Sequence, residues 1–81
     1  MNVQLLQAYV DAALAEIGVR NHGPGRVKAR PDRTDPVNKA WVRVHGSADA
    51  LGFASHLVSL VVRQNWCVTL NGTHRYLRVT T

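Results

Sequence analysis

The stretch WCVTLNGTHRYLRVT, residues 66–80, decides the fold. Two runs that alternate apolar and polar residues flank the pair Asn71-Gly72. This pair is typical of a two-residue hairpin turn, because both turn positions need a positive φ. The turn predicts two antiparallel strands in which Cys67 lies opposite Tyr76. The remaining residues then have to cover one face of this hairpin.

Two more alternating segments lie upstream, RVKAR at 26–30 and KAWVRVHG at 39–46. Each places small or branched apolar residues on one side and basic or aromatic residues on the other, which is typical of a half-buried strand. The segment between them, PDRTDPVN at 31–38, contains two prolines and is predicted to be a loop. The sequence therefore predicts four strands in all.

Two other segments have apolar residues at helical spacing. The first is 3–17, where Asn2 is a plausible N-cap and Gly18 can end the helix in a left-handed conformation. The second runs from Ser47, the expected N-cap, to Asn65, the expected C-terminal cap. The second helix is the more apolar of the two, so we expect it to be the central helix of the fold.

The predicted order is α-β-β-α-β-β in a single domain over residues 1–81. We expect an α+β two-layer sandwich with both helices on one face of a four-stranded, mainly antiparallel sheet. The strand residues expected to face the helices are apolar: Val27, Ala29, Ala40, Val42, Val44, Trp66, Val68, Leu70, Leu77 and Val79.

The opposite face of this sheet is predicted to be open and basic. The chain has a net charge of +5, yet all five acidic residues fall on the predicted helices or in the 31–38 loop. The cations expected on the open face are Arg26, Lys28, Arg30, Lys39, Arg43 and Arg78, with His45, His74, Trp41 and Tyr76 among them. The residues that we predict to bind a partner are Arg26, Lys28, Arg30, Trp41, Arg43, Tyr76 and Arg78.

Composition excludes several classes of protein. A chain of 81 residues has room for one core only, and its single cysteine cannot form an internal disulfide. The first residues do not resemble a signal peptide, and the longest apolar run is too short to span a bilayer. We therefore expect a cytoplasmic protein without a membrane role.

Motifs for catalysis or metal binding are missing from the sequence. The four histidines and the cysteine do not form a metal-ligand pair, and no phosphate-binding loop or dinucleotide fingerprint occurs. The predicted hairpin brings Cys67 diagonally close to His74, but no nucleophile motif accompanies them. We expect a protein that is not an enzyme and that uses no metal or cofactor.

Two functions follow from these features. A basic sheet face with interleaved aromatic residues is typical of proteins that bind single-stranded nucleic acid directly, where cations bind phosphates and rings stack on bases. A structural subunit that pairs through the exposed edges of its sheet is a further alternative.

In size, composition and lack of enzyme motifs, the chain also resembles the small phage-encoded inhibitors known as anti-CRISPR proteins. The resemblance implies that the protein covers the surface of a host defence complex, such as a CRISPR effector protein or ribonucleoprotein, in the cytoplasm of a bacterial cell. Many such inhibitors are acidic mimics of nucleic acid, and this basic chain departs from that pattern. We predict an inhibitor that acts by surface occlusion, as a monomer or small homo-oligomer, with direct nucleic-acid binding as the alternative.

Overall fold

The computed structural model describes residues 1–44 and 49–81. The described residues confirm the predicted order of two helices and four strands in an α+β fold. His45 and Ser47, for which the sequence predicted an open-face position and an N-cap, lie outside the described residues. The elements are α1 (Val3–Glu16), β1 (Ala29–Pro31), β2 (Lys39–Arg43), α2 (Ala50–Val61), the 3-10 turn η1 (Val62–Gln64), β3 (Cys67–Leu70) and β4 (Tyr76–Thr80).

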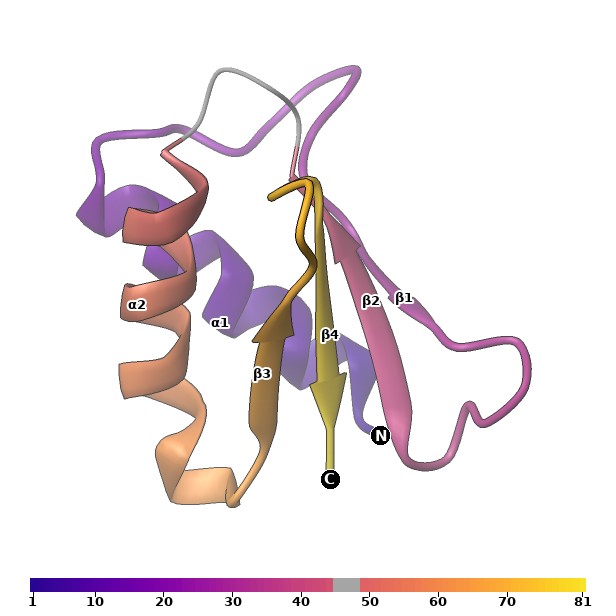
Figure 1. Ribbon diagram of the computed structural model, residues 1–81. Coiled ribbons are helices and arrows are strands. Elements are labelled where there is room, and N and C mark those ends of the chain that lie inside the picture. Colours follow the sequence, from indigo (N-terminus) through magenta and orange to yellow (C-terminus); the bar gives the residue numbers. More distant parts are fainter. Residues whose placement is uncertain (45–48) are drawn as a thin grey trace.

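The four strands form one antiparallel sheet in the order β1-β2-β4-β3. Both helices lie on one side of this sheet, and α2 runs beside the edge formed by β3 (Figure 1). The loop at 32–38 projects on the side away from the helices (Figure 1). The two-layer arrangement therefore leaves one face of the sheet without a covering helix.

The core lies between the helices and the sheet, and the buried side chains among residues 1–44 and 49–81 are all apolar. All ten strand residues predicted to face the helices contribute to it. Seven of them are buried, whereas Trp66, Val68 and Leu70 are only half-buried. These three lie on or next to β3, which is an edge strand and is covered from one side only.

Helix α1 begins and ends as predicted. Asn2 is its N-cap and accepts a hydrogen bond from the backbone N–H of Leu5 at 3.0 Å. Gly18 follows the helix with a φ of 77°, which glycine adopts without steric cost. The buried residues of the helix are Leu6, Val10, Ala13 and Leu14.

Helix α2 differs from the prediction at its start and in its environment. Its N-cap is Asp49, whose side chain accepts from the backbone N–H of Gly52. Its buried residues are Phe53, Leu57 and Val61. The expectation of a central helix is wrong, because α2 packs against α1 and β3 on one side and exposes apolar residues on its other side.

The turn between β3 and β4 is longer than the two residues predicted. Leu70 pairs with Leu77, and Cys67 pairs with Thr80 rather than with Tyr76. The residue with a positive φ in this turn is His74, not Asn71 or Gly72. The difference in register is an even number of residues, so the side chains of β3 and β4 keep their predicted faces, whereas residues 73–75 move from the predicted strand into the turn.

The side chain of Asn71 accounts for the longer turn. Its Oδ1 accepts hydrogen bonds from the backbone N–H groups of Arg75 and Tyr76, each at 3.0 Å. Its Nδ2 donates to the hydroxyl of Thr73 at 2.7 Å. These bonds close a wider loop than two residues allow, and they separate His74 from Cys67 at the far end of β3.

The first strand is shorter than predicted, because side chains replace a strand partner over its first half. Asn21 binds both backbone groups of the buried Val27, accepting from its N–H at 2.7 Å and donating to its carbonyl at 2.8 Å. Gln7 of α1 accepts from the N–H of Ala29 at 2.7 Å. Ladder pairing with β2 therefore begins only at Ala29.

Candidate binding face of the sheet

We use the name open face for the sheet surface opposite the helices. Its side chains come from all four strands and alternate with the buried set. No acidic residue belongs to these strands. The open face consists of Arg30, Lys39, Trp41, Arg43, Cys67, Thr69, Tyr76, Arg78 and Thr80.

The strand order brings residues from four separate segments into one row across the open face. Arg30 of β1 pairs with Trp41 of β2, and Trp41 pairs with Arg78 of β4. Arg78 in turn pairs with Thr69 of β3. The indole of Trp41 therefore has an arginine as neighbour on each side, because side chains of paired residues stand next to one another on a sheet.

A second pair extends this row into a compact cluster. Arg43 pairs with Tyr76, and its guanidinium carbon lies 5.9 Å from the centre of the tyrosine ring. The guanidinium carbon of Arg78 lies 5.8 Å from the centre of the Trp41 ring system. The two rings meet edge to face, with centres 6.4 Å apart. Cation–π contacts of this kind contribute about 0.5–1 kcal/mol each at exposed positions and hold the rings in defined orientations.

The 32–38 loop also holds Trp41 in place. The indole Nε1–H donates to Oδ2 of Asp32 at 2.5 Å. The other carboxylate oxygen of Asp32 accepts from the hydroxyl of Thr34 at 2.6 Å and from its backbone N–H at 2.8 Å. The hydrogen bonds from the Thr34 hydroxyl and from Trp41 hold the pKa of Asp32 well below its usual range. Asp32 is therefore an anion that orients the tryptophan.

The sequence analysis did not assign Asp32 to the site. Carboxylates in a loop rich in proline and polar residues are usually exposed to solvent, and the sequence alone gives Asp32 no partner. The spacing of Asp32 and Thr34 is typical of an Asx turn, which was the available signal that this carboxylate is fixed. The hydrogen bond between Asp32 and Trp41 depends on the pairing of β1 with β2. The spacing of residues in the sequence does not predict this pairing.

Trp41 also lies between two open hollows of the surface. One hollow has a volume of about 330 Å³ and is lined by Trp41 and Tyr76. The other has a volume of about 270 Å³ and is lined by Trp41, Thr69, Asn71 and Arg78. The half-buried indole is therefore accessible from both hollows.

The structure brings together five of the seven predicted binding residues, namely Arg30, Trp41, Arg43, Tyr76 and Arg78. Arg26 and Lys28 are exposed but precede β1, so no strand pairing places them in the row. His74 lies in the hairpin turn and not on a strand, contrary to the open-face prediction. The predicted binding residues that come together are therefore centred on β2 and β4, the two inner strands.

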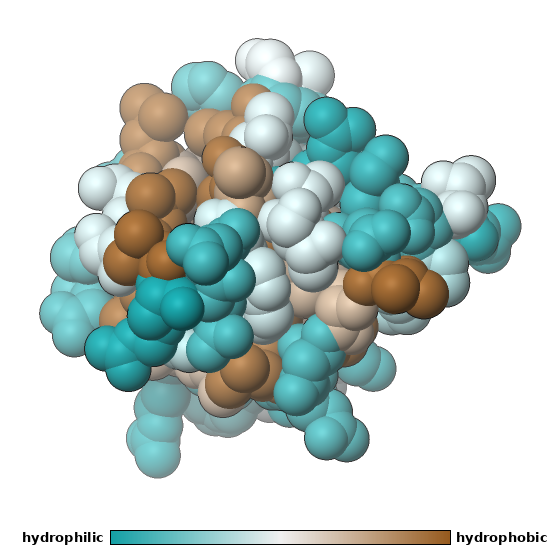
Figure 2. Space-filling model, turned by 90° about the horizontal axis from the view of Figure 1, so that it is seen from below, coloured by the Kyte–Doolittle hydropathy of each residue, from teal (hydrophilic) through white to brown (hydrophobic). Residues whose placement is uncertain are grey.

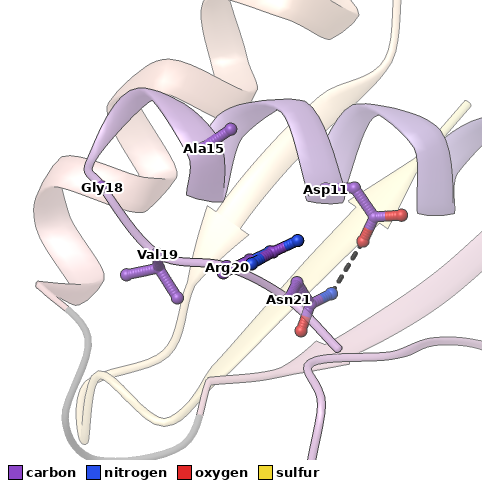
Figure 3. A pocket seen from close by; sticks show the side chains of 6 residues that line it. All are labelled: Asp11, Ala15, Gly18, Val19, Arg20 and Asn21. Carbon is purple, nitrogen blue, oxygen red and sulfur yellow. Dashed lines mark hydrogen bonds between the residues drawn. The ribbon is translucent and has the colours of Figure 1, made fainter. Parts of the chain in front are cut away.

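Another hollow, of about 430 Å³, lies on the side of α1 and is lined by Asp11, Ala15 and residues 18–21 (Figure 3). Its polar groups already serve the fold. Asp11 accepts from the side-chain amides of Gln7 at 3.0 Å and of Asn21 at 2.7 Å, and the same two amides support the chain at 27–29. We therefore assign this hollow to the framework rather than to binding.

Residues 1–44 and 49–81 contain no group of three or more histidine, cysteine, aspartate or glutamate side chains that could hold a metal ion. Across the same part of the chain, neither helix has the length and apolar character needed to cross a membrane. Comparison with protein families, with curated proteins and with solved structures gave no match to this chain.

Proposed function

We propose that this chain is a non-enzymatic binding protein that holds a single-stranded nucleic acid on its open face. The observation that carries the proposal is the position of Trp41 between Arg30 and Arg78 in one cross-strand row. Guanidinium groups on both sides of a ring supply donors for phosphates, and the ring supplies a platform for a base. A stacked base contributes about 1–3 kcal/mol to such binding.

The shape of the open face favours a single strand over a duplex. Bases are accessible for stacking only when they are not paired within a double helix. Reading a duplex groove requires a protruding helix or ribbon, whereas the open face is a sheet surface whose cations and rings lie in rows. Tyr76 is 38% exposed and offers a second ring, perpendicular to that of Trp41.

The inhibitor interpretation stays a prediction that rests on size and composition. A basic inhibitor needs an acidic protein surface as its target, and the same open face would supply the complementary charge. Trp41 and Tyr76 line the hollows on this face, and because exposed rings of this kind stack with bases, we propose nucleic acid as the partner. A protein partner is therefore the alternative outcome of the test.

Fluorescence anisotropy with labelled single strands of about 12 nucleotides, both DNA and RNA, tests the proposal, with a duplex of equal length for comparison. We expect Arg78→Ala to weaken binding about tenfold, which corresponds to about 1.4 kcal/mol for a charge-assisted hydrogen bond. Trp41→Ala combined with Arg43→Ala should abolish binding. Trp41→Phe, which keeps a ring, should retain most of it.

The matched control is Arg20→Ala, which removes one exposed cation beside the hollow on α1 (Figure 3). It should change the affinity less than twofold. An equal loss in Arg20→Ala and Arg78→Ala would mean that overall charge, not the open face, attracts the ligand. No binding to any nucleic acid at low salt would overturn the proposal, and a defence complex or another acidic protein would then be the partner to test.

A further inference from the structure

Helix α2 carries a second surface that the proposed function does not use. Leu51 is 61% exposed, Val58 is 47% exposed and Val62 is 65% exposed. Figure 2 shows apolar atoms (brown) that reach the surface on the α2 side of the molecule, at the left of that view. We use the name α2 stripe for Leu51, Val58 and Val62.

The members of the α2 stripe line up along one side of α2, and the last of them, Val62, begins η1 directly after the helix. These members are seven and four positions apart, a spacing that places them on one side of a helix. The core-facing residues Phe53 and Leu57 lie on the other side of the same helix. Exposed apolar side chains aligned in this way mark a contact surface.

The charges around the α2 stripe identify what can cover it. No lysine, arginine, aspartate or glutamate occurs from Ala50 to Val62. Two copies of a chain with a net charge of +5 repel one another, and this repulsion is weakest where neither surface carries a charge. The uncharged segment is bounded by an acid at one end, Asp49, and a base at the other, Arg63.

We propose that a second copy of this chain packs on the α2 stripe in a two-fold symmetric dimer with antiparallel α2 helices. This arrangement places Leu51 of one subunit against Val62 of its partner and brings Asp49 near Arg63 of the partner subunit at both ends. Antiparallel packing also places the positive end of each helix dipole beside the negative end of the other. A two-fold axis makes the surface self-complementary, as isologous dimers require.

A membrane surface fits the α2 stripe less well. Helices that lie on membranes carry lysine and arginine along their polar face, whereas the polar positions of α2 are serine, histidine and glycine. The stripe is short, so we expect the dimer to be weak and dependent on concentration. The open faces of both subunits stay free, because α2 belongs to the opposite layer (Figure 1).

Sedimentation velocity of the protein without nucleic acid tests the dimer. Over roughly 2–200 µM, concentrations that span the micromolar dissociation constants of weak complexes, the average mass should rise from 8.9 kDa toward twice that value. Val58→Asp and Val62→Lys should keep the protein monomeric at every concentration, since both bury a charge in the interface. Arg63→Glu should weaken the dimer by placing like charges at its ends.

The control is Ala8→Asp, which introduces the same charge on the exposed side of α1. It should dimerise like the wild-type protein, and circular dichroism should show all variants folded. A wild-type protein that stays monomeric, or a Val58→Asp variant that still dimerises, would overturn the proposal. So would a monomer whose stripe binds vesicles with anionic lipids. Because no nucleic acid is present, the result does not depend on the proposed function.

Discussion

Asp32 connects the 32–38 loop to the open face, because its two carboxylate oxygens bind different partners. One oxygen accepts from the indole of Trp41, and the other accepts from Thr34 in the loop itself. The loop thereby fixes the ring plane before any ligand arrives. Preorganisation of this kind lowers the entropy that binding has to overcome.

The lowered pKa of Asp32 makes the contribution of this carboxylate to stability dependent on pH. The unfolded chain binds a proton at Asp32 below about pH 4, whereas the folded protein resists protonation until a lower pH. The stabilisation is therefore complete above about pH 4 and decreases as the pH falls below that value. We expect wild type to resist urea better than Asp32→Asn at about pH 6, with a smaller difference at about pH 2.5.

Trp41→Phe provides the control for this experiment, because it keeps a ring and removes the indole N–H. We then compare the stability of the Trp41→Phe variant with that of the double variant Trp41→Phe, Asp32→Asn. The pH-dependent part of this stability difference should be smaller than in the wild-type background, since one of the hydrogen bonds that lower the pKa of Asp32 is gone. A difference between wild type and Asp32→Asn that is the same at both pH values would contradict the assigned role.

At the scale of elements, the β3–β4 hairpin is held by one turn residue. Removing the Asn71 side chain leaves the backbone N–H groups of Arg75 and Tyr76 without their acceptor. Because these groups are partly open to water, we expect Asn71→Ala to lower the free energy of unfolding by about 1 kcal/mol in urea denaturation. Thr73→Ala removes only the bond between the two side chains and should cost less. An equal loss of unfolding free energy in Asn71→Ala and Thr73→Ala would contradict the role of the Asn71 side chain as the acceptor that closes the turn.

The alternation of residue types predicted which side of each strand is buried, because a period of two does not depend on turn length. The hairpin register could not be predicted, since Asn71-Gly72 also fits a wider turn in which the asparagine side chain supplies the acceptors. The row through Trp41 needs the strand order β1-β2-β4-β3. That order depends on the pairing of β2 with β4, which joins the pair β1–β2 to the pair β3–β4. The spacing of residues along the chain does not predict this pairing.

The exposed side of α2 shows a different limit of sequence patterns. Leu51, Val58 and Val62 have the same composition as a core stripe, so the pattern predicts burial. Whether an apolar stripe on a helix is covered depends on the layers that lie beside that helix. This small domain consists of one layer of helices and one sheet, so the outer side of α2 has no layer over it. An excess of apolar residues over what two layers can cover is therefore the signal for a surface between molecules.

At the scale of the whole molecule, the affinity for nucleic acid should fall as the salt concentration rises. The steepness of this fall reports how many arginines of the open face bind phosphates. If Arg30, Arg43 and Arg78 each bind one phosphate, the slope of log K against log salt is roughly −2, since single strands give about −0.7 per phosphate. Arg30→Ala should reduce the slope to roughly −1.4, whereas Arg20→Ala should not change it. A slope that Arg30→Ala leaves unchanged would remove Arg30 from the contact surface.

The separation of charge between the two layers has a consequence for how fast a partner is found. The strands carry Arg30, Lys39, Arg43 and Arg78 without an acid, whereas α1 carries Asp11 and Glu16 without a base. Although the anion Asp32 lies beside the open face, the opposite net charges of the strands and of α1 give an electric dipole between the two layers of a molecule whose extents are 30 × 25 × 24 Å. In the field of a polyanion this dipole experiences a torque that turns the strands toward the ligand within about 10 Å at 0.1 M salt. If the partner is a polyanion, as proposed, collisions are oriented before contact, and the encounter rate rises most at low ionic strength.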